Sequence, residues 1–211
     1  MCFDLRTFRL VTAVFLFVVS APFVAAEEEA EWKSLFDGKS LDGWTALPGG
    51  QWTVKDGIVH GTSLASERRH GMLISNKQYG DFTARVVYRA NKGNSGFYFR
   101  AERVKSGVSV NGFQAEIDPN NDVGGLYETG GRGWVVKPKA DFVKKYFKPG
   151  DWNVMLVSAH GRRIIVHVNG TKTAELPNDR GRTKGYFGLQ LHGGQDMDVE
   201  FKSVELLVPV E

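Results

Sequence analysis

Cysteine is the residue type that the sequence most clearly lacks, because Cys2 is the only one among 211 residues. Cys2 precedes the apolar run near the N-terminus, so it lies too early to serve as a lipid-attachment site behind that run. The rest of the chain offers no disulfide, no cysteine metal site and no cysteine nucleophile. A hydrophobic core must therefore stabilise the fold, and the chain is long enough to build one as a single domain.

Hydrophobic runs long enough to cross a bilayer are also missing. The apolar stretch Leu10 to Val19 is short, basic residues precede it, and Val24-Ala25-Ala26 provides a small-residue cleavage pattern. We expect residues 1–26 to be a signal peptide and residues 27–211 to form one domain, exported to the periplasm or the medium without membrane insertion. An uncleaved N-terminal anchor is the alternative.

Charge of one sign is not in excess, since the formal net charge is +3. The sequence has no basic stripe and no acidic tail, which argues against nucleic acid and anionic membrane surfaces as partners. Helical periodicity is confined to one or two turns expected within Lys139 to Lys148. The 25 glycines and 14 phenylalanines favour an all-β domain instead.

Turn dipeptides divide the chain into about a dozen short strands, at the spacing typical of a sandwich or jelly roll. Asp56-Gly57 and Asn169-Gly170 each lie between apolar runs and predict tight hairpins. The segment Asp81 to Ala90 alternates apolar and polar residues, as a strand with one buried face does.

Three further segments alternate with the same period but carry reactive side chains on their polar faces. We expect three strands, and their polar positions are Tyr98 and Arg100, then Gln114, Glu116 and Asp118, then Gln190 and His192. Solvated strands usually carry lysine, threonine and serine at such positions. If the three strands are neighbours in one sheet, these side chains converge on one ligand site. A solvated outer face with incidental salt bridges is the alternative.

Oxygen-bearing side chains recur from Asp118 to Asp122, as they do in a calcium loop. However, Val123 occupies the position where such a loop needs glycine, and no bidentate glutamate follows. We therefore predict no metal or other cofactor, with a divalent cation such as calcium as the alternative.

Motifs along nearly the whole domain resemble those of a known family, the 3-keto-disaccharide hydrolases, also named 3-keto-glucoside-1,2-lyases and 3-keto-2-hydroxyglucal hydratases and formerly a domain of unknown function. The similar segments include SLFDGKSLDGW at 34–44, WTVKDGIVHG at 52–61, NSGFYFR at 94–100, KPGDWN at 148–153 and GLQLHG at 188–193. The resemblance implies a concanavalin-like or laminin-G-like jelly-roll sandwich. It also implies cleavage of glycosides that have been oxidised at C3 of the sugar, with an oligosaccharide or glycoside as partner.

Such an activity needs a base, an acid and a group that stabilises an enolate. We expect His192 to be the base or acid, Glu116 the alternative base, and Arg100 the cation that holds the enolate oxygen. A structural histidine and a salt-bridged arginine are the alternatives. The expected substrate-binding residues are Tyr98, Gln114, Asp118, Tyr127, Trp134, Lys137 and Gln190.

Two other functions compete with this interpretation. A non-catalytic carbohydrate-binding module would bind sugar through Tyr127 and Trp134 and turn nothing over. A conventional glycosidase would need two carboxylates that face each other across the scissile bond. Glu116 and Asp118 lie on one predicted strand, where they cannot do so.

We expect the exported protein to begin at Glu27. Intact-mass and N-terminal peptide measurements on secreted protein should show that residues 1–26 are gone. Recovery of a chain that still starts at Met1 would favour the uncleaved anchor.

Overall fold

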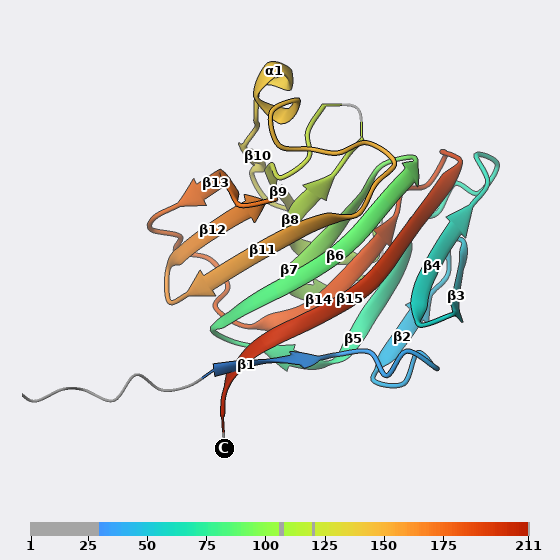
Figure 1. Ribbon diagram of the computed structural model, residues 1–211, viewed down its shortest axis with the longest axis horizontal. Coiled ribbons are helices and arrows are strands. Elements are labelled where there is room, and N and C mark those ends of the chain that lie inside the picture. Colours follow the sequence, from blue (N-terminus) through green and yellow to red (C-terminus); the bar gives the residue numbers. More distant parts are fainter. Residues whose placement is uncertain (1–29, 106–107, 120, 211) are drawn as a thin grey trace, which may run out of the picture.

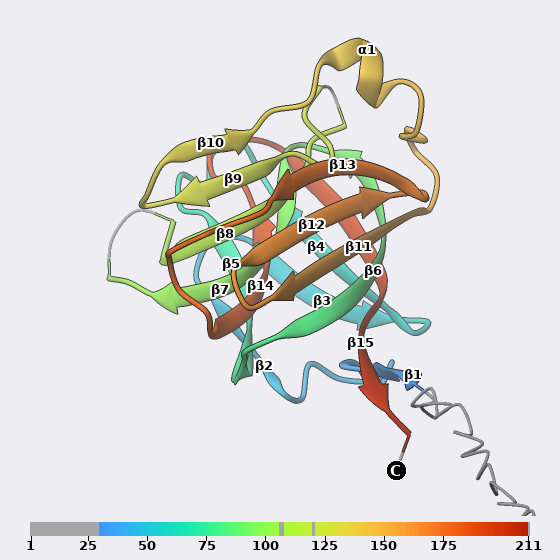
Figure 2. The same cartoon turned by 90° about the vertical axis from the view of Figure 1, so that its left-hand side faces the viewer.

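The protein folds as a sandwich of two antiparallel β-sheets. The structure is a computed structural model, and it describes residues 30–105, 108–119 and 121–210. Figure 1 and Figure 2 show the two layers and the short helix at one end. This architecture confirms the predicted all-β jelly-roll sandwich. The predicted signal peptide, Cys2 and Asn120 of the calcium-like segment lie outside the described residues.

Eight strands form one sheet, in the order β13-β12-β11-β6-β15-β4-β3, with β1 beside the C-terminal half of β15. Their bounds are β1 Ala30–Ser34, β3 Gln51–Lys55, β4 Ile58–Ser63, β6 Phe82–Lys92, β11 Asn153–His160, β12 Arg163–Val168, β13 Thr171–Leu176 and β15 Met197–Pro209.

Seven strands form the other sheet, in the order β10-β9-β8-β7-β14-β5-β2. Their bounds are β2 Trp44–Leu47, β5 Gly71–Tyr79, β7 Ser95–Arg103, β8 Val110–Ile117, β9 Leu126–Thr129, β10 Gly133–Val136 and β14 Gly185–Leu191. The helix α1 spans Ala140–Val143, inside the segment where one or two turns were predicted.

The core between the sheets follows from the alternation in the sequence. Every second residue of β6, from Phe82 to Tyr88, is buried there, as are the apolar faces of β7, β8 and β14. The ring of Phe187 lies at the centre, with its centroid 4.1 Å from that of Tyr79, 4.7 Å from that of Phe82 and 5.1 Å from that of Phe97. Phenylalanine side chains thus supply much of the hydrophobic core, on which the fold depends because the sequence offers no disulfide.

Two tight turns have the backbone that their sequences predict. Asp56 and Gly57 join β3 to β4 with φ values of 51° and 78°, and Asn169 and Gly170 join β12 to β13 with 48° and 82°. Positive φ at both central positions matches the twist of the flanking strands, and Asn, Asp and Gly adopt it most readily. These turns set the register of both hairpins.

A β-bulge interrupts β7 at Arg100. Phe99 pairs with Phe113, but the next pair is Glu102 with Asn111, so Arg100 and Ala101 together lie opposite Gly112. Arg100 has a φ of 48°, and a Cβ at Gly112 would lie 2.7 Å from the Ala101 Cα, which explains the glycine. The bulge shifts the alternation, so Ala101 takes the outer position that strict alternation assigns to Arg100.

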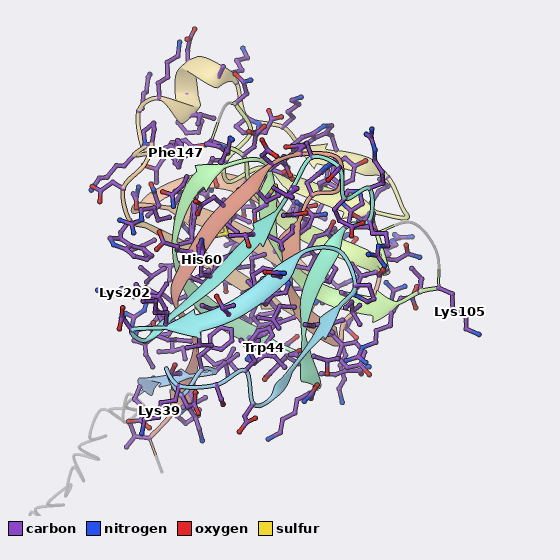
Figure 3. The ribbon with its side chains drawn as sticks, turned by 90° about the vertical axis from the view of Figure 1, so that its right-hand side faces the viewer. Lys39, Trp44, His60, Lys105, Phe147 and Lys202 are labelled. Carbon is purple, nitrogen blue, oxygen red and sulfur yellow. The ribbon has the colours of Figure 1, made fainter. Side chains whose placement is uncertain are left out.

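The outer faces of the two sheets differ in their exposure to water. The eight-stranded sheet carries cross-strand pairs of polar side chains there, such as His60 with Asp198 at 3.0 Å and the ion pair of Arg89 with Glu200 at 2.6 Å, and Figure 3 shows His60 on this side. On the seven-stranded sheet, by contrast, several outward polar residues are buried, among them Gln114 and Glu116 at 4% exposure. Buried polar side chains need partners or a purpose, so the second face is the candidate site.

Replacing Phe187 with alanine should destabilise the fold by about 3–5 kcal/mol, because it removes a fully buried ring and leaves a cavity among aromatic neighbours. Urea unfolding followed by tryptophan fluorescence measures the change. Phe142→Ala on α1, where the side chain is 36% exposed, is the matched control and should cost much less. Equal losses in the two variants would contradict this account of the core.

Candidate functional site

The three strands that carry the predicted polar positions are neighbours, in the order β8-β7-β14. Tyr98 pairs with Gln114 on one side and with Gly188 on the other, and Gly96 pairs with Glu116. Their outward side chains border a hollow of about 330 Å³. Its lining residues are His70, Asn94, Tyr98, Val108, Gln114, Glu116, Tyr127, Thr129, Gly130, Trp134, Gln190 and His192.

A buried chain of hydrogen bonds forms the floor of the hollow. The Gln114 Nε2 donates to the Ser95 carbonyl at 3.2 Å and to the Gln190 Oε1 at 3.0 Å. The Gln190 Nε2 in turn donates to the Tyr98 hydroxyl at 3.2 Å, which lies 2.9 Å from the Thr129 Oγ1. Each amide orients the next, so the floor is rigid before any ligand binds.

Gly96 leaves the space that this network needs. A Cβ at Gly96 would lie 2.4 Å from the Gln114 Nε2, closer than real contacts allow. Any other residue would push the Gln114 amide away from Gln190. The floor therefore requires glycine here for close approach of a neighbouring side chain.

Glu116 is a buried carboxyl group with one strong partner. The Asn94 Nδ2 donates to its Oε1 at 2.6 Å. Burial raises the pKa of Glu116 to about 8, an effect that nearby Asp118 and Asp122 increase and that the Asn94 bond and Lys137 oppose. The raised pKa favours the protonated carboxyl group at neutral pH, and the bond from Asn94 to Oε1 favours the proton on Oε2.

His192 directly follows the last residue of β14, and its side chain lines the hollow. A hydrogen bond to the backbone sets the tautomer of its ring. Its Nδ1 lies 2.8 Å from the Gly193 carbonyl oxygen, which can only accept, so Nδ1 carries the hydrogen in the neutral ring. The lone pair on Nε2 is then available to take a proton. His192 thus has the arrangement of a general base.

His70 lies against His192 from the loop between β4 and β5. The two ring centroids are 4.3 Å apart, edge to face. Burial, and after it the neighbouring His192, lowers the pKa of His70, so this ring is neutral at neutral pH. Two backbone contacts hold its loop, from the Gly194 N–H to the Glu67 carbonyl at 2.6 Å and from the Ala65 N–H to Asp196 at 2.9 Å.

An aromatic pair on the β9–β10 hairpin forms the rim of the hollow. The rings of Tyr127 and Trp134 are 5.3 Å apart and nearly perpendicular, and Trp134 is 36% exposed. The Lys137 Nζ lies 4.8 Å from the centre of the Trp134 ring and 3.3 Å from Asp122. An exposed indole of this kind offers an apolar face to a sugar ring.

Seven of the ten predicted site residues line the hollow. These are His192, Glu116, Tyr98, Gln114, Gln190, Tyr127 and Trp134. Lys137 contacts the rim, and Asp118 raises the pKa of Glu116, but neither lines the hollow.

The predicted placement of Arg100 beside Tyr98 is wrong. Because the bulge in β7 turns it away, Arg100 is 1% exposed, and its Nη2 donates to the Gly161 carbonyl at 2.8 Å and lies 3.5 Å from Asp81. It therefore ties β7 to turns beside β6 and β11 and does not line the hollow.

Sequence reasoning missed five lining residues, His70, Asn94, Val108, Thr129 and Gly130. Asn94 opens the NSGFYFR segment that carries part of the family resemblance, so that motif was the available signal. His70 stands directly before β5, in a loop with no alternating pattern, and no sequence signal links it to His192.

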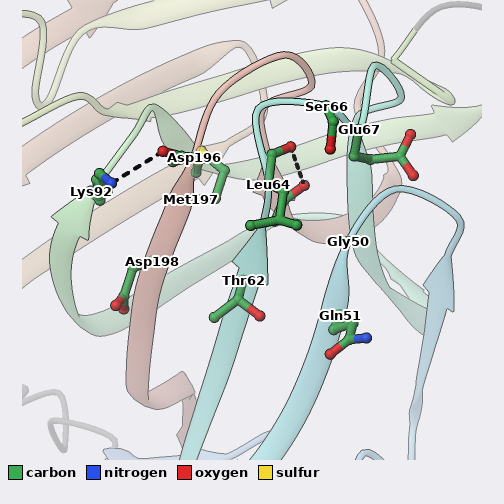
Figure 4. Close-up of a pocket in the computed structure, with 11 residues that line it drawn as sticks. Gly50, Gln51, Thr62, Leu64, Ser66, Glu67, Lys92, Asp196, Met197 and Asp198 are labelled. Atoms are coloured by element: carbon green, nitrogen blue, oxygen red, sulfur yellow. Dashed lines mark hydrogen bonds and ion pairs between the residues drawn. The ribbon is translucent and has the colours of Figure 1, made fainter.

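A larger hollow of about 800 Å³ lies elsewhere, near the start of β15 (Figure 4). Its carboxylates are engaged within the protein: Asp196 contacts Lys92 at 3.2 Å, Asp198 contacts His60 at 3.0 Å, and Glu67 contacts Arg69 at 2.6 Å. Size alone favours this hollow. We place the site in the smaller one because a carboxyl group with a raised pKa, Glu116, lies there together with two histidines.

Metal-binding and membrane-spanning features are not found in the described part of the chain. Within residues 30–105, 108–119 and 121–210, no group of three or more His, Cys, Asp or Glu side chains is arranged to hold a metal ion. The same ranges contain no helix with the length and apolar character needed to cross a membrane.

Comparison with known proteins identifies a family and a fold. Residues 31–207 match the sequence profile of a family described as 3-keto-alpha-glucoside-1,2-lyase-like domains. No curated protein is similar enough in sequence to count as a relative.

Three solved structures have the same fold at low sequence identity. The carbohydrate-binding module CBM66 from Bacillus subtilis superposes with a TM-score of 0.61 at 19% identity, over 77% of this chain and 93% of the module. A Parabacteroides distasonis protein provisionally described as a glycosyl hydrolase gives 0.62 at 19% identity, over 85% and 94%. The kappa-carrageenase from Pseudoalteromonas carrageenovora, in complex with an oligotetrasaccharide, gives 0.57 at 12% identity, over 90% and 100%.

The raised pKa of Glu116 predicts a pH-dependent stability. The folded chain keeps this proton up to about pH 8, whereas the unfolded chain loses it near the ordinary value of 4.5. Between these values the folded state binds more protons at Glu116, so this group should contribute a fall of about 1.4 kcal/mol per pH unit to the free energy of unfolding as pH rises.

Glu116→Gln mimics the protonated carboxyl and should remove that slope, while Glu31→Gln, at an exposed position of β1, should keep it. Urea unfolding at several pH values between 5 and 8 measures the slope. Parallel pH profiles for wild type and Glu116→Gln would show that the Glu116 carboxyl has an ordinary pKa.

Proposed function

Because the chain belongs to the family of 3-keto-alpha-glucoside-1,2-lyase-like domains, we propose that it is a carbohydrate-active enzyme that cleaves glycosides bearing a ketone at C3. The reaction is proton removal at C2, elimination of the C1 substituent and hydration, which together amount to hydrolysis of the glycoside. The observation that carries this proposal is the meeting of the His192 base and the buried Glu116 acid in one hollow.

The ketone makes the C2 proton acidic, because the electron pair left on C2 delocalises onto the C3 oxygen. In this proposal the His192 Nε2 takes that proton. The Nδ1 keeps its hydrogen and donates it to the Gly193 carbonyl oxygen at 2.8 Å, which stabilises the imidazolium that forms. General-base catalysis of this kind is typically worth about 10²–10⁴-fold in rate.

The enolate then expels the C1 oxygen, forming the C1–C2 double bond and restoring the ketone. The departing oxygen needs a proton, and the protonated Oε2 of Glu116 supplies it. In the hydration step the Glu116 carboxylate takes a proton from the water that adds at C1, and the imidazolium returns its proton to C2. Both groups end in their starting forms, so the cycle closes without a cofactor.

A conventional glycosidase fits the hollow less well, because Glu116 is the only carboxylate among its described lining residues. That mechanism needs a second carboxylate across the scissile bond. A non-catalytic carbohydrate-binding module is the stronger alternative, since the Tyr127 and Trp134 rim suits sugar binding by itself. A turnover measurement distinguishes the two functions, because the enzyme cleaves its sugar and the binding module does not.

We also propose that the protein acts after export, in the periplasm or outside the cell. The support for this is the signal-like segment in residues 1–26. The protein would then act on an oxidised oligosaccharide or glycoside before this substrate enters the cell.

Incubation of the protein with a 3-keto-disaccharide in D₂O should give cleavage together with deuterium at C2. His192→Ala should reduce both by about 10²–10⁴-fold, because the base is lost. NMR spectroscopy of the sugar products measures the two signals in one experiment.

His160→Ala is the matched control, since His160 is an exposed histidine whose ring contacts Thr83 in the eight-stranded sheet. It should keep wild-type turnover. Tight sugar binding by the wild-type protein without cleavage or exchange would instead support the binding module.

A further inference from the structure

The proposed reaction needs a hydrogen-bond donor at the C3 oxygen, where negative charge develops as the enolate forms. Arg100 was predicted for this role, but its Nη2 is committed to the Gly161 carbonyl outside the hollow. Another lining residue must fill it. The inference below therefore rests on the proposed function and assigns one further group within the same site.

We propose that His70, as a neutral imidazole, donates its Nε2 hydrogen to the C3 oxygen while His192 removes the proton from C2. His70 transfers no proton in this step. It stabilises the charge on the oxygen and keeps its own hydrogen when the ketone is restored, so protons and electrons balance without it.

Position is the first argument for this assignment. C2 and C3 are bonded neighbours, so the donor for the C3 oxygen must lie next to the base that acts at C2. The ring of His70 is 4.3 Å from that of His192, centroid to centroid, and both line the same hollow. The two rings are thus spaced to address adjacent atoms of one sugar.

The hydrogen-bond chain in the floor supplies the second argument. The Gln114 Nε2 donates its two hydrogens to the Ser95 carbonyl and the Gln190 Oε1. The second of these bonds orients the Gln190 amide. The Gln190 Nε2 then points one hydrogen at the Tyr98 hydroxyl and the other at the His70 Nδ1, at 3.2 Å and 3.4 Å.

An amide nitrogen cannot accept a hydrogen bond, so the His70 Nδ1 must be the acceptor in that contact. The hydrogen of the neutral ring is therefore on Nε2. No described residue accepts a hydrogen bond from the His70 Nε2. The floor network thus presents an N–H group that a ligand can use.

The other amide donors of the hollow are less suited to the role. Gln114 and Gln190 have both hydrogens engaged within the floor. Asn94 is directed to Glu116 at 2.6 Å, on the side of the leaving group in the proposed reaction. His70 is the lining donor whose ring also contacts the base.

His70→Leu and His70→Gln test the assignment, because leucine fills similar space without a donor and glutamine places an amide N–H near the position of Nε2. His70→Leu should lower both turnover and deuterium exchange at C2 by about 10²–10³-fold, the usual loss for one such donor. His70→Gln should recover at least tenfold of that loss.

The tautomer can be measured in the wild-type protein, independently of whether the variants fold. Nitrogen-15 NMR of the His70 ring should show the hydrogen on Nε2, and a ring protonated on Nδ1 would overturn the inference. Wild-type turnover in His70→Leu, or a glutamine variant no better than the leucine variant, would overturn it as well. Failure of the wild-type protein to exchange or cleave would instead count against the proposed function.

Discussion

Both amide hydrogens of Gln114 are used inside the protein, one on the Ser95 carbonyl and one on Gln190. Because Gln114 is 4% exposed and Gln190 3%, water cannot easily replace these partners, and leaving either unpaired would be costly. The bond from Gln114 to Gln190 orients the Gln190 amide, and that amide in turn donates to the Tyr98 hydroxyl and to the His70 Nδ1. Gly96 leaves room for the Gln114 amide, because a Cβ at this position would lie 2.4 Å from the Gln114 Nε2.

Burial has two opposite chemical effects in this hollow. It raises the pKa of the Glu116 carboxyl and lowers the pKa of the His70 imidazole, and in both cases the neutral form is favoured. A neutral acid, a neutral donor and the His192 base can then share one small space without repelling one another. The enolate is the first full negative charge that the proposed reaction creates there, and it appears next to polarised N–H and O–H groups.

The sequence was sufficient to predict the sandwich and most of the polar face, because both depend on local alternation. Gln114, Glu116 and Gln190 lie outward for the same reason that Phe113, Ala115 and Leu189 lie inward. Arg100 could not be placed in this way, since one extra residue in β7 shifts the period and only the register with Gly112 shows it. The contact between His70 and His192 joins parts of the chain that are far apart, and no periodicity encodes it.

The edge position of the β9–β10 hairpin separates two kinds of change that the site can undergo. Tyr127 and Trp134 belong to strands at the end of the seven-stranded sheet, and β10 pairs within that sheet only with β9. Substitutions of these two rings alter the rim of the hollow and leave the amide bonds among β7, β8 and β14 in place. Under the proposed function, selection can therefore retune sugar preference by remodelling an outer hairpin, while the proposed acid, base and their supports are inherited unchanged.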